Sequence, residues 1–151
     1  RLLHPFLTSS PPTSDVDVVF LGTCSCTPST TRGVSSLALR LNWRDGGTWM
    51  FDVGEGTQLQ LQRTRDVRPG KVRRVFLTHS HGDHVFGLPG MLCLIGQDRD
   101  KHTSEPVEVY GPEGTRRWLR ENMRYTASRV CAPYRVHELL GVPIAPGWRE
   151  G

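Results

Sequence analysis

The chain has 151 residues, which is enough for one domain built on a single hydrophobic core. Lys and Arg total 19 against 15 Asp and Glu, so the formal charge is +4, and only two of the cations are Lys. This small excess does not by itself decide between an RNA ligand and an ordinary solvated surface. The longest apolar stretch, residues 85–95, is well short of the roughly 20 residues of a membrane helix, so no transmembrane segment is predicted.

The two ends of the chain differ in composition from its middle. Residues 1–14 contain Pro, Ser and Thr but no Asp or Glu, which predicts a disordered lead-in over residues 1–15. The end of a transit peptide is the alternative interpretation. Gly and Pro over the last ten residues predict a divergent tail at 141–151. One domain is therefore expected at residues 16–140.

The first half of this domain reads as three strands and a helix. Residues 16–21 form an apolar run closed by Gly22, and residues 35–42 place Leu37, Leu39 and Leu41 on one face of a half-buried strand. The Asp-Gly-Gly turn at 45–47 leads into a period-two segment at 49–53, which predicts a hairpin. Residues 57–64 have helical composition.

In the second half, strands alternate with helices. Strands are predicted at residues 72–77, 107–110 and 130–139, and a helix at residues 113–125. Strands followed by alternating strands and helices indicate a mixed α/β layer structure in which helices cover the sheet.

The four cysteines predict a reduced, intracellular protein. Cys24, Cys26, Cys93 and Cys131 form no CxxC pair, and Cys93 lies in an apolar run. A cytoplasmic or nuclear location is favoured over a mitochondrial one. The Cys24-Cys26 pair is compatible with a metal site or a disulfide, but inert thiols are the preferred interpretation, and no chemistry is assigned to them.

The motif HSHGDH at residues 79–84 is the strongest functional signal. His79 and His81 are two apart in extended backbone, so they project to the same side and suit one shared metal ion. Gly82 frees the backbone to turn, so that Asp83 and His84 suit a neighbouring second ion. Half of the six histidines of the chain fall in this motif, which disfavours an incidental polar loop.

The motif and three further stretches of the sequence resemble a known protein family. HxHxDH at the end of a strand resembles the signature of the metallo-β-lactamase superfamily, and residues 20–32 (FLGT followed by PSTTR), 51–58 (FDVGEGTQ) and 82–90 (GDHVFGLPG) are similar in order and spacing to the ribonuclease Z family. The GLPG ending resembles the short form of that enzyme. The resemblance runs from about residue 16 to 140. It implies the amino-terminal part of an α/β metallo-β-lactamase fold, an αββα sandwich.

The resemblance also implies a cofactor, a substrate and residue roles. It implies two zinc ions, a precursor tRNA cut to leave a free 3′-hydroxyl, and a homodimer. Asp83 would act as proton acceptor as well as metal ligand. Asp52 would be a carboxylate behind the metal ligands that orients them by hydrogen bonding. Judged from the residues alone, Asp52 is equally suited to cap the following helix. Substrate contacts are implied for the loop that contains Thr30, Thr31 and Arg32.

This sequence departs from the family pattern in three ways. Cys24 and Ser25 replace a usual Gly and Ala, and Ser80 replaces a usual Leu. The family completes its metal sites with a later His and a later Asp and His, none of which is matched here. His137 precedes the position expected for the next ligand, so a structural role is predicted for it, with His4 and His102 also outside the site.

Two Arg-rich stretches are candidates for phosphate contact, although a solvated surface is the simpler interpretation of each. One comprises Arg63, Arg65, Arg68, Lys71, Arg73 and Arg74, and the other comprises Arg116, Arg117, Arg120 and Arg124. The resemblance therefore implies a zinc-dependent endoribonuclease that removes the 3′ trailer from tRNA precursors, here in a truncated, incomplete form. The alternatives are a small-molecule hydrolase on the same fold and a non-catalytic fragment.

Overall fold

A computed structural model describes residues 15–43, 46–100 and 105–141 of the chain. The predicted lead-in lies outside the described residues except for Asp15, and the predicted tail lies outside them except for Gly141. His4 and His102 also fall outside. Among the described residues, no helix has the length and apolar character needed to cross a membrane.

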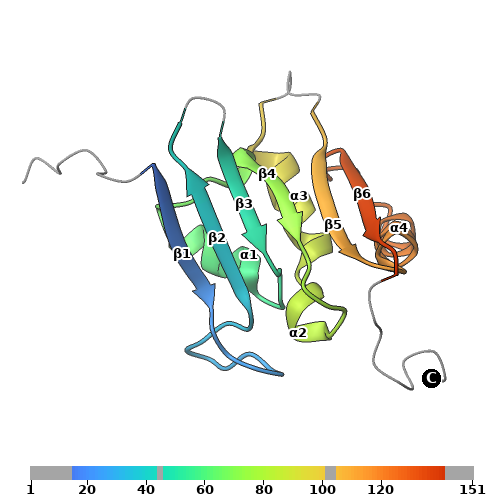
Figure 1. The fold of residues 1–151 in the computed structure, drawn as a ribbon, viewed down its shortest axis with the longest axis horizontal. Coiled ribbons are helices and arrows are strands. Elements are labelled where there is room, and N and C mark those ends of the chain that lie inside the picture. Colours follow the sequence, from blue (N-terminus) through green and yellow to red (C-terminus); the bar gives the residue numbers. More distant parts are fainter. Residues whose placement is uncertain (1–14, 44–45, 101–104, 142–151) are drawn as a thin grey trace, which may run out of the picture.

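The described chain is built on a six-stranded sheet whose spatial order follows the sequence (Figure 1). The strands are β1 (Val16–Gly22), β2 (Ser36–Leu41), β3 (Gly47–Phe51), β4 (Val72–Phe76), β5 (Val107–Pro112) and β6 (Tyr134–Leu139). β1, β2 and β3 pair antiparallel, and β3 to β6 pair parallel. The predicted hairpin at residues 35–53 is therefore confirmed as β2 and β3.

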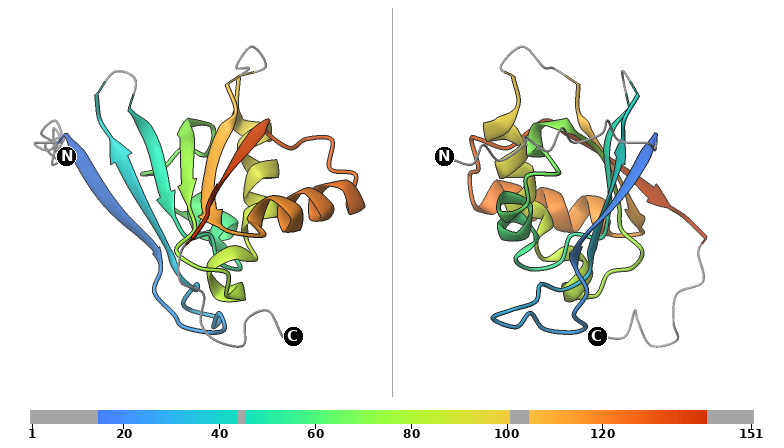
Figure 2. Two further views of the ribbon diagram at one scale, coloured as in Figure 1. Left: turned by 45° about the vertical axis from the view of Figure 1, so that its right-hand side comes forward. Right: turned by 90° about the vertical axis from the view of Figure 1, so that its left-hand side faces the viewer.

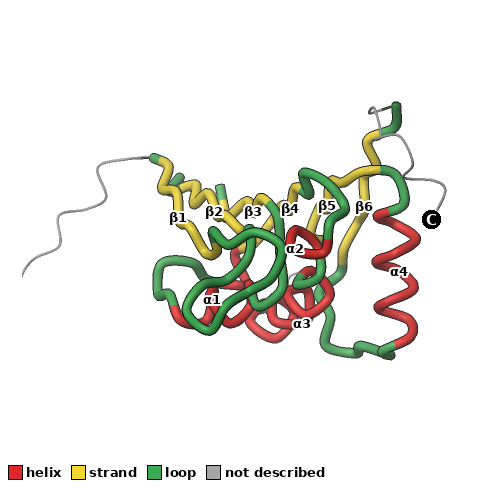
Figure 3. The backbone as a smooth tube through the Cα atoms, turned by 90° about the horizontal axis from the view of Figure 1, so that it is seen from below, coloured by secondary structure: helices red, strands yellow, loops and turns green. Residues whose placement is uncertain are grey.

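The longer helices lie on one face of this sheet (Figures 2 and 3). The helical segments are α1 (Thr57–Arg63), the 3-10 turn η1 (Pro69–Lys71), α2 (Gly82–Val85), α3 (Leu88–Asp98) and α4 (Thr115–Tyr125). Crossovers between parallel strands are nearly always right-handed. Because β3 to β6 are added in one direction, their crossover helices collect on the same side.

The core lies between the sheet and α3. Met50, Val75 and Val109 come from three neighbouring strands and are fully buried. On α3, the buried side chains are Leu88, Met91, Leu92 and Ile95, the i, i+3, i+4, i+7 pattern of one helix face. Burial of each such side chain contributes about 1.5–3 kcal/mol.

Helix α3 is an element that the sequence patterns above do not predict. Gly87, Pro89 and Gly90 resemble helix breakers, but Pro89 occupies the first turn, where its missing N–H costs nothing. Gly90 lies against the Gln58 side chain, which a Cβ would meet at 2.1 Å. The apolar spacing from residue 88 to residue 95 was the signal available for this helix.

The predicted strand at residues 130–139 is too long. β6 begins at Tyr134, and residues 130–133 form a turn and coil that pack on α3. The Ala132 N–H donates to the Leu92 carbonyl at 3.0 Å, and a Cβ on Gly96 would lie 2.0 Å from the Val130 carbonyl oxygen. Pro133 has no N–H for a strand ladder, so pairing starts after it.

The sheet face opposite the helices carries a continuous row of apolar and aromatic side chains. Strand register aligns Leu37, Phe51, Phe76, Tyr110 and His137 in that order across β2 to β6. Ring centroids are 5.0, 4.9 and 4.6 Å apart along the four rings. The described residues thus form one sheet with helices on one face, half of the layers of an αββα sandwich.

Candidate metal centre

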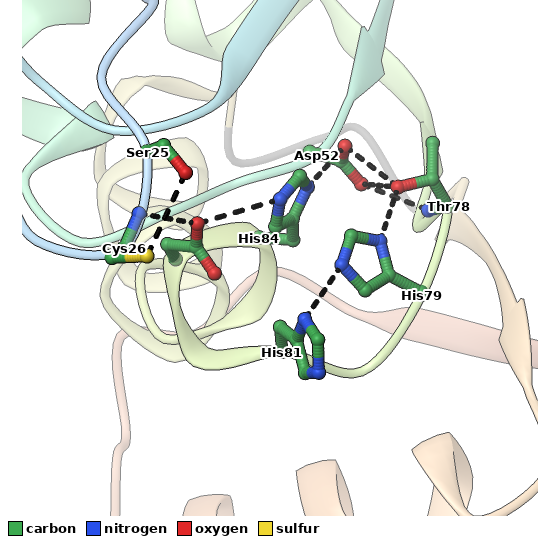
Figure 4. A network of polar contacts seen from close by, with 8 residues as sticks. Ser25, Cys26, Asp52, Thr78, His79, His81 and His84 are labelled. Atoms are coloured by element: carbon green, nitrogen blue, oxygen red, sulfur yellow. Dashed lines mark hydrogen bonds and ion pairs between the residues drawn. The ribbon is translucent and has the colours of Figure 1, made fainter. Parts of the chain in front are cut away.

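The HSHGDH motif lies at the carboxyl end of β4, where the strand leads into a loop and then into α2 (Figure 4). His81 is the residue before α2, and its extended backbone ends the loop. Asp83 and His84 lie in the single turn of α2, so their side chains leave the backbone in a different direction from those of His79 and His81. The turn at Gly82 is what separates the two pairs.

The Asp52 carboxylate lies behind the motif and accepts several hydrogen bonds from it and from Thr78. Asp52 follows β3, is 5% exposed and has a positive φ of 59°. Its carboxylate accepts the Thr78 main-chain N–H at 2.8 Å and the Thr78 hydroxyl at 2.8 Å, and lies 2.7 Å from His84 Nδ1. Helix α1 has Gly56 at its N-cap and no side-chain cap, so the interpretation of Asp52 as a helix cap is wrong.

These contacts fix the tautomers of two histidines. A carboxylate only accepts, so His84 Nδ1 must carry the proton that bonds to Asp52, which leaves Nε2 as the free lone pair. The Thr78 hydroxyl gives its only proton to Asp52 and therefore accepts from His79 Nδ1, 3.0 Å away. His79 Nε2 is then also unprotonated, and it accepts a hydrogen bond from His81 Nδ1 at 3.1 Å. Each histidine thus presents Nε2 toward the motif.

The donor atoms of the motif form two pairs. His79 Nε2 lies 3.1 Å from His81 Nδ1, and His84 Nε2 lies 3.6 Å from Asp83 Oδ2. Two ligands held tetrahedrally at about 2.0–2.1 Å from one zinc ion are roughly 3.3 Å apart. The rings of His79 and His84 are 4.0 Å apart between centroids, so the two pairs adjoin.

The four residues form pairs but no larger donor set. Over residues 15–43, 46–100 and 105–141, no three His, Cys, Asp or Glu side chains form a group able to hold a metal ion. Imidazole nitrogen and carboxylate oxygen are the donors that zinc takes in catalytic sites, so the donor chemistry of each pair fits that ion. Metal binding by these residues stays a prediction.

The pKa shifts in the cluster favour the protonation states that bind metal. Burial lowers the pKa of His79 below the ordinary imidazole value, and the nearby His84 and His81 rings lower it further. The main-chain N–H of Cys26 lowers the pKa of Asp83 below the ordinary carboxyl value. A neutral imidazole and an ionised carboxylate are the forms that bind metal.

Cys26 is a residue of the site that the sequence did not indicate. Its N–H donates to Asp83 Oδ2 at 2.8 Å, from the loop between β1 and β2, and its backbone has a positive φ of 64°. The contact uses the main chain, so the side-chain type carries no signal for it. Thr30, Thr31 and Arg32 lie exposed in the same loop, and their contact with substrate stays a prediction.

Two glycines allow the loops of the site to meet. A Cβ on Gly54 would lie 2.1 Å from the Asp83 carbonyl oxygen, and one on Gly87 would lie 2.1 Å from the Gly54 carbonyl oxygen. The Val53 N–H donates to the His84 carbonyl at 2.7 Å, and the Gly87 N–H to the Val53 carbonyl at 2.9 Å. These bonds hold the Asp52 loop against α2.

His137 lies apart from this cluster. Its Nε2 pairs with the Glu108 carboxylate on the neighbouring strand, and its ring stacks on Tyr110 at 4.6 Å. Tyr110 on β5 lies between it and Phe76 of β4, the strand that leads into the motif. The contacts are those of a sheet residue.

The two Arg-rich stretches have different settings. Arg74 lies over Trp49 on the open sheet face, 4.8 Å from the ring centroid, whereas Arg68, Lys71 and Arg73 lie near the start of β4. The first stretch is therefore not one patch. The second is an exposed helix face formed by Arg116, Arg117, Arg120 and Arg124.

The chain belongs to the metallo-β-lactamase superfamily. The profile of that family, described as "Metallo-beta-lactamase superfamily", matches residues 30–142. Within it, the chain is 46% identical over 126 residues to Zinc phosphodiesterase ELAC protein 1 of Bos taurus, which covers 83% of this chain and 34% of the relative. It is 43% identical over 122 residues to Ribonuclease Z of Streptococcus pneumoniae (strain CGSP14), covering 81% of this chain and 38% of the relative.

A solved structure shows the same similarity. The crystal structure of human tRNase Z, short form, matches with a TM-score of 0.73 and 44% identity over 85% of this chain and 46% of that one. The resemblance inferred from the motifs is thereby confirmed. The chain spans between a third and two-fifths of the length of these curated relatives.

Replacement of Cys26 by proline tests the contact with Asp83. Proline removes the N–H and cannot adopt a φ of 64°, so the pKa of Asp83 should rise toward the ordinary carboxyl value. The bond stabilises the fold at pH values above that ordinary pKa, and the contribution is lost as pH falls through the lower folded value. Cys26→Gly keeps the N–H and suits the positive φ, so it is the matched control. The Asp83 pKa is measured by NMR titration of the zinc-free chain, and equal values in the two variants would exclude the contact.

Proposed function

We propose that this chain contributes the HSHGDH half of the metal centre of a zinc-dependent phosphodiesterase that removes the 3′ trailer from tRNA precursors. The observation that carries the proposal is the set of two adjoining donor pairs, His79 with His81 and Asp83 with His84, oriented from below by Asp52. The printed names of the relatives, a zinc phosphodiesterase and ribonuclease Z, support a phosphodiester substrate over the small-molecule alternative.

Each residue of the site has a distinct task in this proposal. Asp52 holds His84 with Nε2 unprotonated, and through Thr78 it does the same for His79. Zinc, when bound, would polarise the phosphoryl oxygen and lower the pKa of a bound water. Asp83, kept ionised by the Cys26 N–H, would accept the proton released from the attacking water. The product would keep a free 3′-hydroxyl on the tRNA.

Substrate and partner contacts extend the proposal beyond the metal centre. Thr30, Thr31 and Arg32 are exposed in the loop from which the Cys26 N–H donates to Asp83. An Arg side chain suits contact with phosphate, which supports a role for this loop in substrate binding. A homodimer and an intracellular location complete the proposal. The four cysteines, which all carry free thiols, support a reducing compartment.

Zinc binding by the chain tests the proposal. We expect weak binding of up to two ions, read by calorimetry and by the visible spectrum of a Co²⁺ substitute. His81→Ala should remove half of the first donor pair and weaken binding by at least about tenfold. His137→Ala is the matched control, because His137 is a histidine outside the cluster. Equal affinity in the wild type and the His81 variant would refute the assignment.

A further inference from the structure

A cavity lies at the opposite end of the strands from the metal centre. It has a volume of about 500 Å³ and opens between the β2–β3 hairpin and η1. β4 begins beside this cavity at Val72 and ends at Phe76, just before the motif, so the whole length of the strand separates the two places. Figure 1 shows the start of β3 and α2 at opposite ends of the sheet. We call this space the hairpin cavity.

Cations dominate the wall of the hairpin cavity. Its charged lining residues are the four cations Arg40, Arg68, Lys71 and Arg73 and the two carboxylates Asp66 and Glu105. Arg40 pairs with Asp17 at 3.6 Å, and Arg73 with the exposed Glu105 at 3.5 Å. Within the described part of the chain, no ion pair is found for Arg68 or Lys71. The cavity therefore attracts anions.

Arg73 presents a donor that is not satisfied within the described residues. Its Nη1 atom is buried and has no hydrogen-bond partner there; the Glu105 carboxylate lies 3.5 Å from this same atom, which makes a long ion pair. Gly47, at a φ of 67°, lets the Arg73 side chain pass close to the hairpin, because a Cβ there would meet Arg73 Cγ at 2.6 Å. The rest of the Arg73 side chain is partly exposed, so only this one donor lacks a close acceptor, and an oxyanion in the cavity would supply one nearer than Glu105.

An aromatic ring stands at the rim of the same cavity. Trp43 lines it and is 52% exposed. The Gly46 N–H donates to the Trp43 carbonyl at 3.1 Å, and a Cβ on Gly46 would lie 3.0 Å from Trp43 Nε1. The hairpin backbone thus packs against the indole. An exposed ring beside cations is the combination that binds a base together with its phosphate.

We propose that the hairpin cavity binds a nucleoside monophosphate unit, with the phosphate against Arg68, Lys71 and Arg73 and the base against Trp43. The volume of the cavity lies within the range typical of small-molecule sites. The unit is either a free nucleotide or one residue of a single-stranded RNA, which share this chemistry. The proposal does not rest on zinc or on the activity proposed above.

The test measures binding of three probes to the full chain with a chelator present. The probes are inorganic phosphate, AMP and a single-stranded oligoadenylate without terminal phosphates, titrated by calorimetry and by NMR of the indole N–H signals. We expect AMP to bind more tightly than phosphate, and Trp43→Ala to weaken AMP by about tenfold. The same variant should leave phosphate binding unchanged.

Charge variants separate the cavity from general electrostatics. The double variant Arg68→Gln, Lys71→Gln should weaken AMP by at least about fivefold, because both cations face the phosphate. Arg117→Gln, an exposed arginine on α4, is the control and should have little effect. His79→Ala with His81→Ala should also bind AMP normally, so failure of the metal proposal cannot be mistaken for failure of this one.

The outcomes decide the source of the ligand as well as its existence. Binding of AMP alone assigns the cavity to a free nucleotide, and binding of the oligoadenylate that weakens in the double variant and in Trp43→Ala assigns it to RNA. Either result supports the cavity as a nucleotide site. Absence of binding by AMP and the oligoadenylate, or binding that is equal in the wild type and the double variant, would overturn the proposal.

Discussion

Asp52→Ala is expected to lower the free energy of unfolding by about 3 kcal/mol, since three partly buried hydrogen bonds to Thr78 and His84 are lost, at about 1 kcal/mol each. Alanine also tolerates the φ of 59° poorly, which adds about 1 kcal/mol. Zinc affinity should fall by about 10- to 100-fold, because the two histidines lose the bonds that orient them. Urea denaturation and zinc titration measure the two effects.

Two further variants separate these causes. Asp52→Asn keeps a residue that tolerates positive φ and retains one acceptor oxygen, so it should recover much of the stability but little of the zinc affinity. Asp66→Ala removes an exposed carboxylate that accepts a hydrogen bond from the Thr64 hydroxyl, two residues away. This change should alter the free energy of unfolding by less than about 0.5 kcal/mol. If the Asp52→Ala variant proves as stable as the Asp66→Ala variant, the Asp52 carboxylate does not organise the site.

The 151-residue polypeptide is expected to cleave precursor tRNA at trace rates or not at all. The described residues supply two donors to each predicted ion, whereas a catalytic zinc site needs about three protein ligands. Incomplete shells bind metal weakly and lose it to chelators. The assay compares this polypeptide, with added zinc, with a version extended by downstream sequence of its relatives, which should be active.

The same assay includes His81→Ala in both proteins. Loss of activity in the extended protein on this change would place His81 in its working metal centre. Robust cleavage by the 151-residue polypeptide that His81→Ala abolishes would mean that the described donors suffice. Such a result would contradict the two-pair description of the site.

The motif was readable from sequence because its residues are contiguous. His79 to His84 carry their spacing in the chain, and relatives bear out the family that this spacing indicated. The role of Asp52 was only half predictable, since its partner Thr78 becomes a neighbour through the parallel pairing of β3 with β4. The Cys26 contact was not predictable, because a main-chain N–H has no sequence signature.

The strands were predicted better than the faces they present. Leu37 and Leu39 alternate as a half-buried strand should, but Ser36 and Ala38 are the residues buried on the helix side of the sheet. When a strand carries apolar residues on both faces, alternation alone does not show which face packs against the helices. The hairpin cavity could not be predicted from the sequence either, since Trp43 and Arg68 come to line one cavity only when β4 pairs with β3.

The strand order has a consequence for how the chain folds during synthesis. Every strand pairs with its neighbour in sequence, so each strand pairing closes a loop of at most a few dozen residues. Asp52, Thr78 and His84 all lie on the N-terminal side of β5, so the contacts among them need no residue beyond about 85. The contacts that orient His79 and His84 can therefore form during synthesis before β5 and β6 have been made.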